Sequence, residues 1–490
     1  MLGYTPDAWL NPEATKVGYE ASFTRHFYKP KPCAPSPRSP PTSAPSKRRP
    51  RAGWMGCWWG RAEGLLMQRS VHHGAAKAPY ATLRLTWSPV EPMRKAERCM
   101  AEAQAHRAGR YRTQPTGYRA FLPAPLPPDP PLRLEGELQL LLSQADRALG
   151  RLDGSVETLP NPDLFVLMYV RKEAVLSSQI EGTQSSLQDL LAAEAQLFGA
   201  DSLPKDVDEV VNYVRAMKHG LARLESLPVS MRLIGEIHAE LLQGVRGSRL
   251  TPGELRRSQN WIGPSGCSLA TATFVPPPPE ELPEALGALE RFLHQQDAIP
   301  ALIKIGLAHA QFETIHPYLD GNGRVGRLLI TFLLTERGIL QKPVLYLSHY
   351  FKQQRQAYYD HLQAVREAGD WEGWLAFFLR GVAAVSQEAS GTARRILALR
   401  EEHRAQITIR LGRAAGNGHR VLESMYDRPI VSVQAIQELI GGTYAAANGL
   451  VARLEQLGIL REMTGQKRNR RFCYQPYVEL FGESHQEVLT

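Results

Sequence analysis

Apolar residues recur at helical spacing along most of the chain downstream of Pro123. The first such pattern, Leu134, Leu138, Leu141, Leu142 and Ala145, directly follows the stretch PAPLPPDPP, which we expect to be extended. The same spacing predicts further helices, namely Asp163–Ile180 with Gly182 as its cap, Asp206–Leu224, Val229–Leu242, Leu282–His294, Ile303–Ala310, Leu328–Glu336, Tyr358–Ala368, Trp371–Val385 and Ala389–Arg410. The chain is therefore predicted to be mainly α-helical.

Two segments depart from this pattern. Between Thr251 and Pro279, short apolar pieces on either side of GPSG predict a short β-hairpin. Near the C-terminus, two short helices joined by a glycine turn precede two strands around the basic tip GQKRNR; the predicted elements are Gln434–Ile440, Tyr444–Leu457, Ile459–Met463 and Arg471–Tyr474. This order of elements is typical of a winged helix-turn-helix.

The N-terminal 99 residues differ in composition from the rest. They carry 16 Lys and Arg against 6 Asp and Glu, so the net charge of +9 belongs to this region and the remainder is close to neutral. The tract Lys29–Arg51 is rich in Pro, Ser and basic residues, yet residues 1–99 also hold five of the eight tryptophans. Residues 1–99 are expected to be a disordered, basic interaction arm or an annotation error upstream of a true start at Met100.

Composition also bounds the compartment. The longest apolar run, Leu328–Leu334, is far shorter than the roughly 20 residues that span a bilayer, and the N-terminus lacks the pattern of a secretory signal. Five cysteines without paired spacing favour a reducing cytoplasm, and Cys267 is expected to be incidental rather than catalytic.

The stretch HPYLDGNGRVGR, His316–Arg327, combines groups suited to transfer of a phosphate-containing group. Its glycines and the start of the following helix can direct backbone N–H groups at an anion. Arginine side chains fit phosphate oxygens, an aspartate is a hard ligand for phosphate-bound Mg²⁺, and a histidine can act as a base. The residues in question are His316, Asp320, Gly321, Asn322, Gly323, Arg324, Val325, Gly326 and Arg327.

Three other interpretations of this stretch are not supported by its surroundings. Gly321, Gly323 and Gly326 satisfy GxGxxG, but a helical pattern and Pro317 precede them where a dinucleotide fold needs a strand. No P-loop sequence GxxxxGK[ST] occurs. His309 and Glu313 share a helical face with His316 without forming HExxH, so we interpret them as packing or orienting residues rather than metal ligands.

HPYLDGNGRVGR resembles the signature of the Fic (Fido) family, HPFxDGNGRxGR, with Tyr318 in place of Phe. The resemblance extends over roughly residues 110–385. It implies an all-α Fic fold that transfers AMP from ATP to a Ser, Thr or Tyr hydroxyl of a protein, with ATP and Mg²⁺ as cofactors.

Five regions are expected, namely the extension 1–99, an N-terminal helical region 100–235, a catalytic core 236–385, a linker helix 386–415 and a winged helix-turn-helix 416–480.

The resemblance also implies roles for single residues. His316 would be the base, Asp320 the Mg²⁺ ligand, and the rest of the motif through Arg327 the phosphate-binding group. Tyr358 and Tyr359 match a pair near the adenine and ribose. A flap that aligns the target by strand addition would comprise Asn260, Trp261, Ile262, Gly263, Thr273 and Phe274.

A second motif concerns control. SSQIEG, with Ser177 and Glu181, resembles the family's inhibitory motif [ST]xxxE[GN], in which the Glu pairs with the second motif arginine, here Arg327. A carboxylate competing with a phosphate for one guanidinium is a reasonable brake. The alternative is that Ser178–Glu181 is only a capping box at a helix start.

The expected partners are ATP, an unidentified target protein, a second copy of the chain in self-modification or a homodimer, and DNA at the winged helix. A membrane is not among them. Two other functions stay open: removal of AMP in the same pocket, with Glu181 orienting water, and a nucleotide-sensing, DNA-binding regulator. Lys467, Arg468, Arg470 and Arg471 would contact DNA phosphates, with Tyr444, Asn448 and Arg453 on the second helix.

Overall fold

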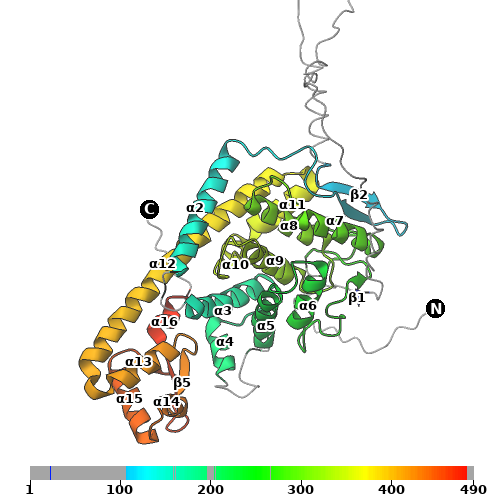
Figure 1. The fold of residues 1–490 in the computed structure, drawn as a ribbon. Coiled ribbons are helices and arrows are strands. Elements are labelled where there is room, and N and C mark those ends of the chain that lie inside the picture. Colours follow the sequence, from blue (N-terminus) through cyan, green and yellow to red (C-terminus); the bar gives the residue numbers. More distant parts are fainter. Residues whose placement is uncertain are drawn as a thin grey trace, which may run out of the picture. The chain divides into compact units, whose positions relative to one another are not determined.

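The computed structural model describes residues 22–23, 106–157, 159, 162–195, 204, 206–264 and 266–482. These residues are mostly helical, as predicted (Figure 1). The expected disorder or misannotation of residues 1–99 lies outside the described residues, apart from β1 (Ser22–Phe23). The backbone of β1 pairs antiparallel with β4 (Arg256–Arg257).

Eleven helices precede the C-terminal module in the described part of the chain. They are α2 (Glu137–Glu157), α3 (Pro162–Ile180), α4 (Leu187–Glu194), α5 (Val207–Arg223), α6 (Met231–Leu241), α7 (Leu282–His294), α8 (Ala301–Ile315), α9 (Asn322–Glu336), α10 (Ser348–Gln353), α11 (Arg355–Ala368) and α12 (Trp371–Leu411). A 3₁₀ turn, Pro279–Glu281, precedes α7. The short helices α4 and α10 were not predicted.

Helix α12 is continuous where the sequence predicted two helices. Its buried stripe runs on through Val385, Ala389, Ala393 and Ile396, so the polar residues between them do not interrupt the helical face. Helix α2 packs along α12 through its own apolar stripe (Figure 1).

Helices α8 and α9 are the most deeply buried helices around the His316–Arg327 motif. Every residue of α8 from Leu302 to Ile315 is buried, and most of α9 is buried as well. A helix that is enclosed on all sides needs apolar residues on every face, which explains the weak amphipathic pattern in both segments. The sequence HPYLDG connects these two helices, so its position is fixed by the core.

Strands are few and short. β2 (Gly109–Thr113) and β3 (Arg119–Pro123) form an antiparallel pair that was not predicted. The Phe121 N–H donates to the Val275 carbonyl at 2.9 Å, which ties this pair to the predicted hairpin segment. The hairpin itself is reduced to one antiparallel bridge between Ile262 and Phe274.

The C-terminal module contains both predicted helices and both predicted strands. Its elements are the 3₁₀ turn Gly412–Ala414, α13 (Ala415–Ser424), β5 (Ile430–Ser432), α14 (Val433–Ile440), α15 (Tyr444–Gln456), β6 (Arg461–Glu462), β7 (Arg471–Cys473) and α16 (Gln475–Glu479). The strands form a sheet in the order β5-β7-β6. The identity of this module as a winged helix, like the five region boundaries, stays a prediction.

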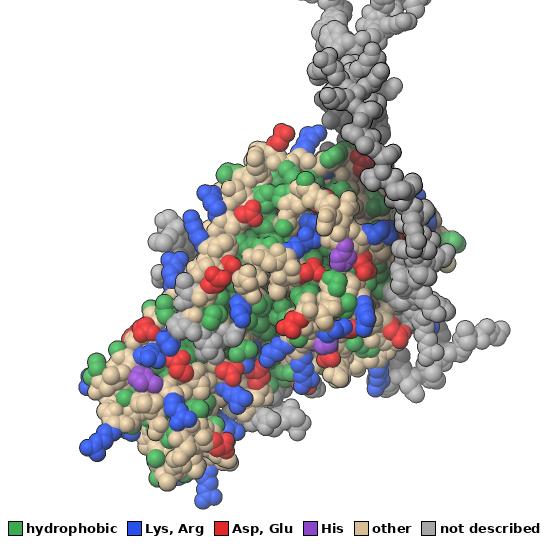
Figure 2. All heavy atoms as spheres, in the orientation of Figure 1, with side chains coloured by type: hydrophobic (Ala, Val, Ile, Leu, Met, Phe, Trp, Pro, Cys, Tyr) green, Lys and Arg blue, Asp and Glu red, His purple; other side chains and the backbone are tan. Residues whose placement is uncertain are grey.

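Acidic and basic side chains are mixed over the face of the molecule drawn in Figure 2. This agrees with the near-neutral charge downstream of residue 99. Within the described residues, none of the helices combines the length and the apolar character that crossing a membrane requires.

Candidate functional site

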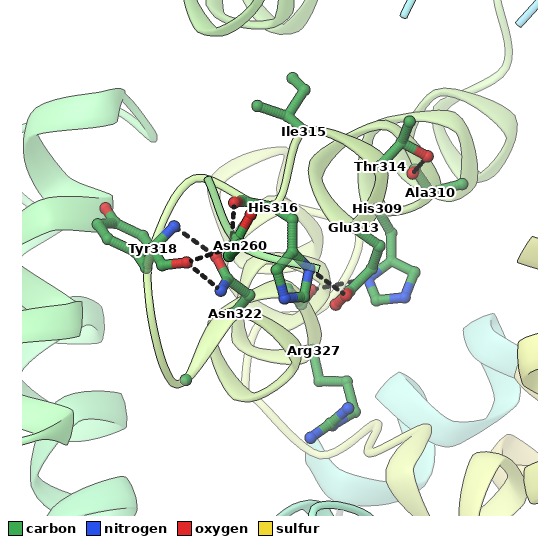
Figure 3. A network of polar contacts seen from close by, with 12 residues as sticks. Asn260, His309, Ala310, Glu313, Thr314, Ile315, His316, Tyr318, Asn322 and Arg327 are labelled. Carbon is green, nitrogen blue, oxygen red and sulfur yellow. Dashed lines mark hydrogen bonds and ion pairs between the residues drawn. The ribbon is translucent and has the colours of Figure 1, made fainter. Parts of the chain in front are cut away.

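The loop between α8 and α9 is shaped by two residues in the left-handed backbone region. His316 ends α8 with φ 47° and ψ 61°, and its N–H donates to the Phe312 carbonyl at 2.9 Å. Gly321 precedes α9 with φ 81°, a conformation that glycine adopts without steric cost. The chain therefore reverses between the two helices, and the His316 imidazole lies near the N-terminus of α9 (Figure 3).

Two buried asparagines hold this loop. The Asn322 side chain accepts from the Tyr318 N–H and donates to the Tyr318 carbonyl, both at 2.8 Å (Figure 3). Asn260 donates to the carbonyls of Tyr318 (2.9 Å) and His316 (3.3 Å), and Arg256 Nε donates to the His316 carbonyl at 2.9 Å. The Asn322 amide is thus occupied with the loop, which leaves its backbone as the part suited to a phosphate.

The His316 side chain is buried and neutral. Burial, together with the positive charges of Arg256 and Arg366, lowers the pKa of His316 to about 3. Its Nδ1 lies 4.0 Å from Oε2 of Glu313, one helical turn earlier. A neutral imidazole has a nitrogen lone pair available throughout the physiological range, which is what a general base requires.

His238 on α6 supports the loop from the opposite side. Its Nδ1 accepts from the Gly253 N–H at 2.8 Å, so its Nε2 carries the proton and donates to the Asp320 carbonyl at 2.9 Å. Its ring stacks on Tyr318 with centroids 3.8 Å apart. Burial lowers the pKa of His238 to about 4, which keeps this arrangement neutral. Sequence reasoning missed His238, because a lone histidine on an amphipathic helix carries no distinguishing signal.

Asp320 is held by arginines and stays partly exposed. Its Oδ1 accepts from the Gly321 N–H (2.7 Å) and from Arg324 Nη2 (3.2 Å), while Arg246 Nε lies 3.7 Å from Oδ2. Arg324 also donates to Glu209 of α5 at 3.0 Å. Arg324 is fully buried in this network, and its predicted contact with a triphosphate stays a prediction.

The three motif glycines have different functions. Only Gly321 has a positive φ. A Cβ on Gly323 would collide with the Glu181 carboxylate, and a Cβ on Gly326 would collide with the Glu313 carboxylate. Gly323 and Gly326 therefore make room for two carboxyl groups against the first turns of α9.

Arg327 directs its guanidinium at the end of α3. Its Nε donates to Ser177 Oγ at 2.8 Å, and its Nη2 donates to the Ser177 carbonyl (3.0 Å) and to Glu181 Oε1 (2.7 Å). Burial among its neighbours would raise the pKa of Glu181, but the charge and hydrogen bond of Arg327 outweigh it and hold that pKa below its usual value. Ser177, Glu181 and Arg327 are thus brought together as the motif predicted.

The capping-box alternative for Ser178–Glu181 is wrong. Helix α3 ends at Ile180, and Gly182 follows with φ 95°, so this segment terminates a helix. The capping box in this region is formed by Ser186 and Asp189 at the start of α4.

The remaining predicted cofactor residues divide into buried and exposed. Val325 lies in the core, and its N–H donates to the Gly321 carbonyl as part of α9. Tyr358 is buried, and its hydroxyl lies 2.9 Å from Nε2 of His309. Tyr359 is 37% exposed, with its ring centroid 5.2 Å from that of Tyr358.

His309 orients rather than ligates. Its Nδ1 lies 2.9 Å from the Gly326 carbonyl, which can only accept, so Nδ1 carries the proton and Nε2 accepts from Tyr358. Burial lowers the pKa of His309 to about 3. Across the described part of the chain, no three His, Cys, Asp or Glu side chains are grouped closely enough to hold a metal ion.

Residues 139–222 match the family model described as Fic/DOC family N-terminal, and residues 228–334 match the one described as Fic/DOC family. The chain therefore contains a Fic domain. The N-terminal match includes α3 with Ser177 and Glu181, and the Fic match includes the flap segment and the whole His316–Arg327 motif.

Named relatives share part of this region. The chain is 32% identical over 205 residues to protein adenylyltransferase Fic of Aedes aegypti and 29% identical over 197 residues to that of Drosophila grimshawi. Each match covers 40% of this chain but only 37% and 36% of the relative. The chain thus spans little more than a third of the length of these relatives. A Fic family protein from Desulfovibrio desulfuricans G20 superposes with a TM-score of 0.47 at 17% identity, covering 70% of this chain and 97% of its own.

The flap residues of the Fic domain lie in two environments. Asn260 and Phe274 are buried, whereas Trp261, Ile262, Gly263 and Thr273 are partly or fully exposed. Gly263 packs so closely on Cys267 and the Thr273 backbone that a Cβ would crowd both. The single antiparallel bridge between Ile262 and Phe274 lies in the segment that Asn260 ties to the motif loop.

Proposed function

We propose that this chain is a protein adenylyltransferase, which transfers AMP from ATP to a Ser, Thr or Tyr hydroxyl of a target protein. The proposal rests on the constellation around the N-terminus of α9. A neutral histidine, a partly exposed carboxylate and a buried guanidinium converge there on a helix end that favours anions. The names of the relatives point to the same reaction.

In the proposed reaction, His316 Nε2 takes the proton of the target hydroxyl. The hydroxyl oxygen attacks the α-phosphorus of ATP, the bond from that phosphorus to the β-phosphate oxygen breaks, and pyrophosphate leaves. Backbone N–H groups in the first turn of α9 would bind phosphate oxygens, and Arg327 would bind the terminal phosphate. The exposed ring of Tyr359 would lie near the nucleoside, with Tyr358 and His309 behind it.

Asp320 suits a Mg²⁺ ion that is bound mainly by phosphate oxygens. Its carboxylate is 26% exposed, and Mg²⁺ is often held by only one or two protein carboxylates together with substrate phosphates. When bound there, Mg²⁺ would neutralise charge on the phosphates. Arg324 and Glu209 would keep the Asp320 carboxylate in place for it.

We further propose that Glu181 restrains this activity. The position of the Glu181 side chain is the observation that supports this restraint. The Glu181 carboxylate pairs with Arg327 and lies against Gly323 in the first turn of α9. It occupies the place where the helix end and the guanidinium would together bind the terminal phosphate of ATP. A phosphate in the productive position therefore has to displace Glu181.

The edge formed by Ile262 and Phe274 would align the target segment by strand addition. AMP removal and DNA-dependent regulation are left as rival outcomes, because the described residues offer no contact that favours either of them.

The position of the transferred label tests the reaction type. With Glu181→Gly as the enzyme and as its own acceptor, ATP labelled on the α-phosphate should label the protein, and ATP labelled on the γ-phosphate should not. Label from the γ-phosphate alone would replace adenylyl transfer by phosphoryl transfer. Absence of both labels, with nucleotide still bound, would favour the nucleotide-sensing function.

A further inference from the structure

We propose that Glu313 is a positioning residue for His316, whose carboxylate stabilises the imidazolium that forms when His316 takes the proton of the target hydroxyl. This inference rests on the proposed transfer. Glu313 itself forms and breaks no bond in the step. The proton moves from the hydroxyl to His316 Nε2, and the carboxylate faces the opposite nitrogen, Nδ1.

The geometry places the carboxylate within reach of the ring. Glu313 lies on α8, one turn before His316, and its Oε2 is 4.0 Å from His316 Nδ1 (Figure 3). The backbone carbonyl of Glu313 also raises the pKa of His316 by hydrogen bonding. A small rotation of the Glu313 side chain would close the remaining gap, and such contacts commonly tighten when substrate binds.

The neighbouring helix is shaped around this carboxyl group. A Cβ at Gly326 would collide with Glu313 Oε1, so the absence of a side chain there makes room for the carboxylate between α8 and α9. Glu313 Oε1 has no hydrogen-bond partner among the described residues, although it is buried. A buried carboxylate without a partner is costly, and natural proteins rarely keep one without a use for it.

Charged and titratable groups surround Glu313 from every adjoining element. Burial raises the pKa of Glu313 to about 7, Arg327 and Arg366 lower it, and Glu181 raises it. The groups that face it are His316 on α8, Glu181 after α3, Arg327 on α9, and Tyr358 and Arg366 on α11. Glu313 is consequently part ionised near neutral pH, where a small rise in pH increases its negative charge beside His316.

The charge of Glu313 offsets an unfavourable field at His316. Burial and the positive charges of Arg256 and Arg366 disfavour the imidazolium. The Glu181 charge and the backbone carbonyl of Glu313 already favour the imidazolium. The Glu313 carboxylate, 4.0 Å from Nδ1, would add to them when it is ionised, and it would remain beside the ring in Glu181→Gly. Removing that charge should slow proton transfer without altering how ATP binds.

Kinetics with a matched control test this role. In the Glu181→Gly background, Glu313→Gln should lower kcat about tenfold or more, leave KM for ATP within about twofold, and remove an ionisation near pH 7 from the kcat profile. Glu313→Asp should recover part of the loss. Glu173→Gln is the control, since Glu173 is another buried carboxyl with a pKa of about 7, and its hydrogen-bond partners are Tyr213 and Ser348.

Equal losses in Glu313→Gln and Glu173→Gln, or an unchanged kcat in Glu313→Gln, would overturn the inference. If Glu181→Gly itself transfers no AMP, the proposed function has failed. In that case, ¹⁵N NMR of labelled histidines tests separately whether Glu313 is coupled to His316. The His316 ring signals should shift with a midpoint near pH 7 in the wild type and in Glu173→Gln, and this step should vanish in Glu313→Gln. A step that survives in Glu313→Gln would contradict coupling between the two residues.

Discussion

Arg327 shows how one side chain joins the two halves of the site. All three of its hydrogen bonds go to Ser177 and Glu181 at the end of α3, 146 to 150 positions away in sequence. A planar guanidinium can hold a carboxylate and a phosphate in the same geometry, so Glu181 and a terminal phosphate compete directly. Replacement of Arg327 by lysine would lose this geometric match.

Arg324 is expected to contribute mainly to stability. It is fully buried and bridges Glu209 and Asp320. Arg324→Met should lower the free energy of unfolding by about 3 kcal/mol, because Glu209 would lose its nearest cation. The double variant Arg324→Met/Glu209→Gln should recover part of that loss in chemical denaturation. If Arg324→Met alone is as stable as the wild type, the ion pair between Arg324 and Glu209 does not contribute to stability.

Among single residues, those inside the two motifs were better predicted from the sequence than the residues that hold the motif loop in place. The pairing of Arg327 with Glu181 follows from two motifs that resemble one family. Glu209, His238 and Arg256 were missed, because each lies 60 or more positions from its partner in the loop and no local pattern marks it. The hydrogen bonds of the Asn322 and Arg324 side chains also could not be predicted, since a motif gives residue types but not the direction in which side chains point.

Close approach between helices sets the position of α9. Where α5 meets α9, a Cβ on Gly220 would collide with the ring of Phe332. Glu209 also lies on α5, so the same contact fixes the acid that holds Arg324. Tight contacts of this kind leave little room for relaxation, because protein interiors are densely packed.

Gly220→Ala should therefore destabilise the protein by about 1 to 3 kcal/mol through overpacking. Gly150→Ala is the matched control on α2, since a Cβ there meets no atom within 4 Å. That change should be neutral or stabilise by up to about 1 kcal/mol, because alanine favours a helix over glycine. Thermal unfolding of both variants compares them directly, and equal shifts would contradict the close approach.

The elements were predictable where apolar spacing was strong. The helices from α5 to α9 begin and end close to the predicted residues, with two exceptions. Helix α8 continues five residues beyond the predicted Ala310, to Ile315, and α9 extends back to Asn322 through the motif. The division of α12 was wrong, because polar composition does not by itself end a helix whose buried stripe continues. Strands β2 and β3 were missed because only Ala120 and Phe121 on β3 are well buried. Two adjacent buried residues do not form the alternating pattern by which a strand is recognised.

Over the whole molecule, buried titratable groups make stability depend on pH. Three histidines, His238, His309 and His316, have pKa values of about 4, 3 and 3, while Glu173 and Glu313 have values of about 7. Between pH 6.5 and 4.5 the unfolded chain binds protons at the three histidines, and the folded chain binds them at the two carboxyls. From these five groups the unfolded state gains about one proton more, and the lowered pKa values of His361, His403 and His419 act in the same direction.

Stability should accordingly fall by about 1 kcal/mol per pH unit as the pH drops from 6.5 to 5, and most steeply near pH 5. Glu173→Gln removes one opposing carboxyl, so its stability should fall about twice as steeply over the same range. Chemical denaturation at the two pH values measures both slopes. Equal or greater stability of the wild type at pH 5 would contradict this assignment of the buried charges.

We propose above that Glu181 blocks an adenylyl-transfer site whose base is His316. The most direct test follows covalent label from α-labelled ATP, with Mg²⁺, on the wild type, Glu181→Gly and Glu181→Gly/His316→Ala. We expect little label on the wild type, at least about tenfold more on Glu181→Gly, and none on the double variant. Equal labelling of the wild type and Glu181→Gly would contradict the brake, and label that persists in the double variant would contradict the role of His316.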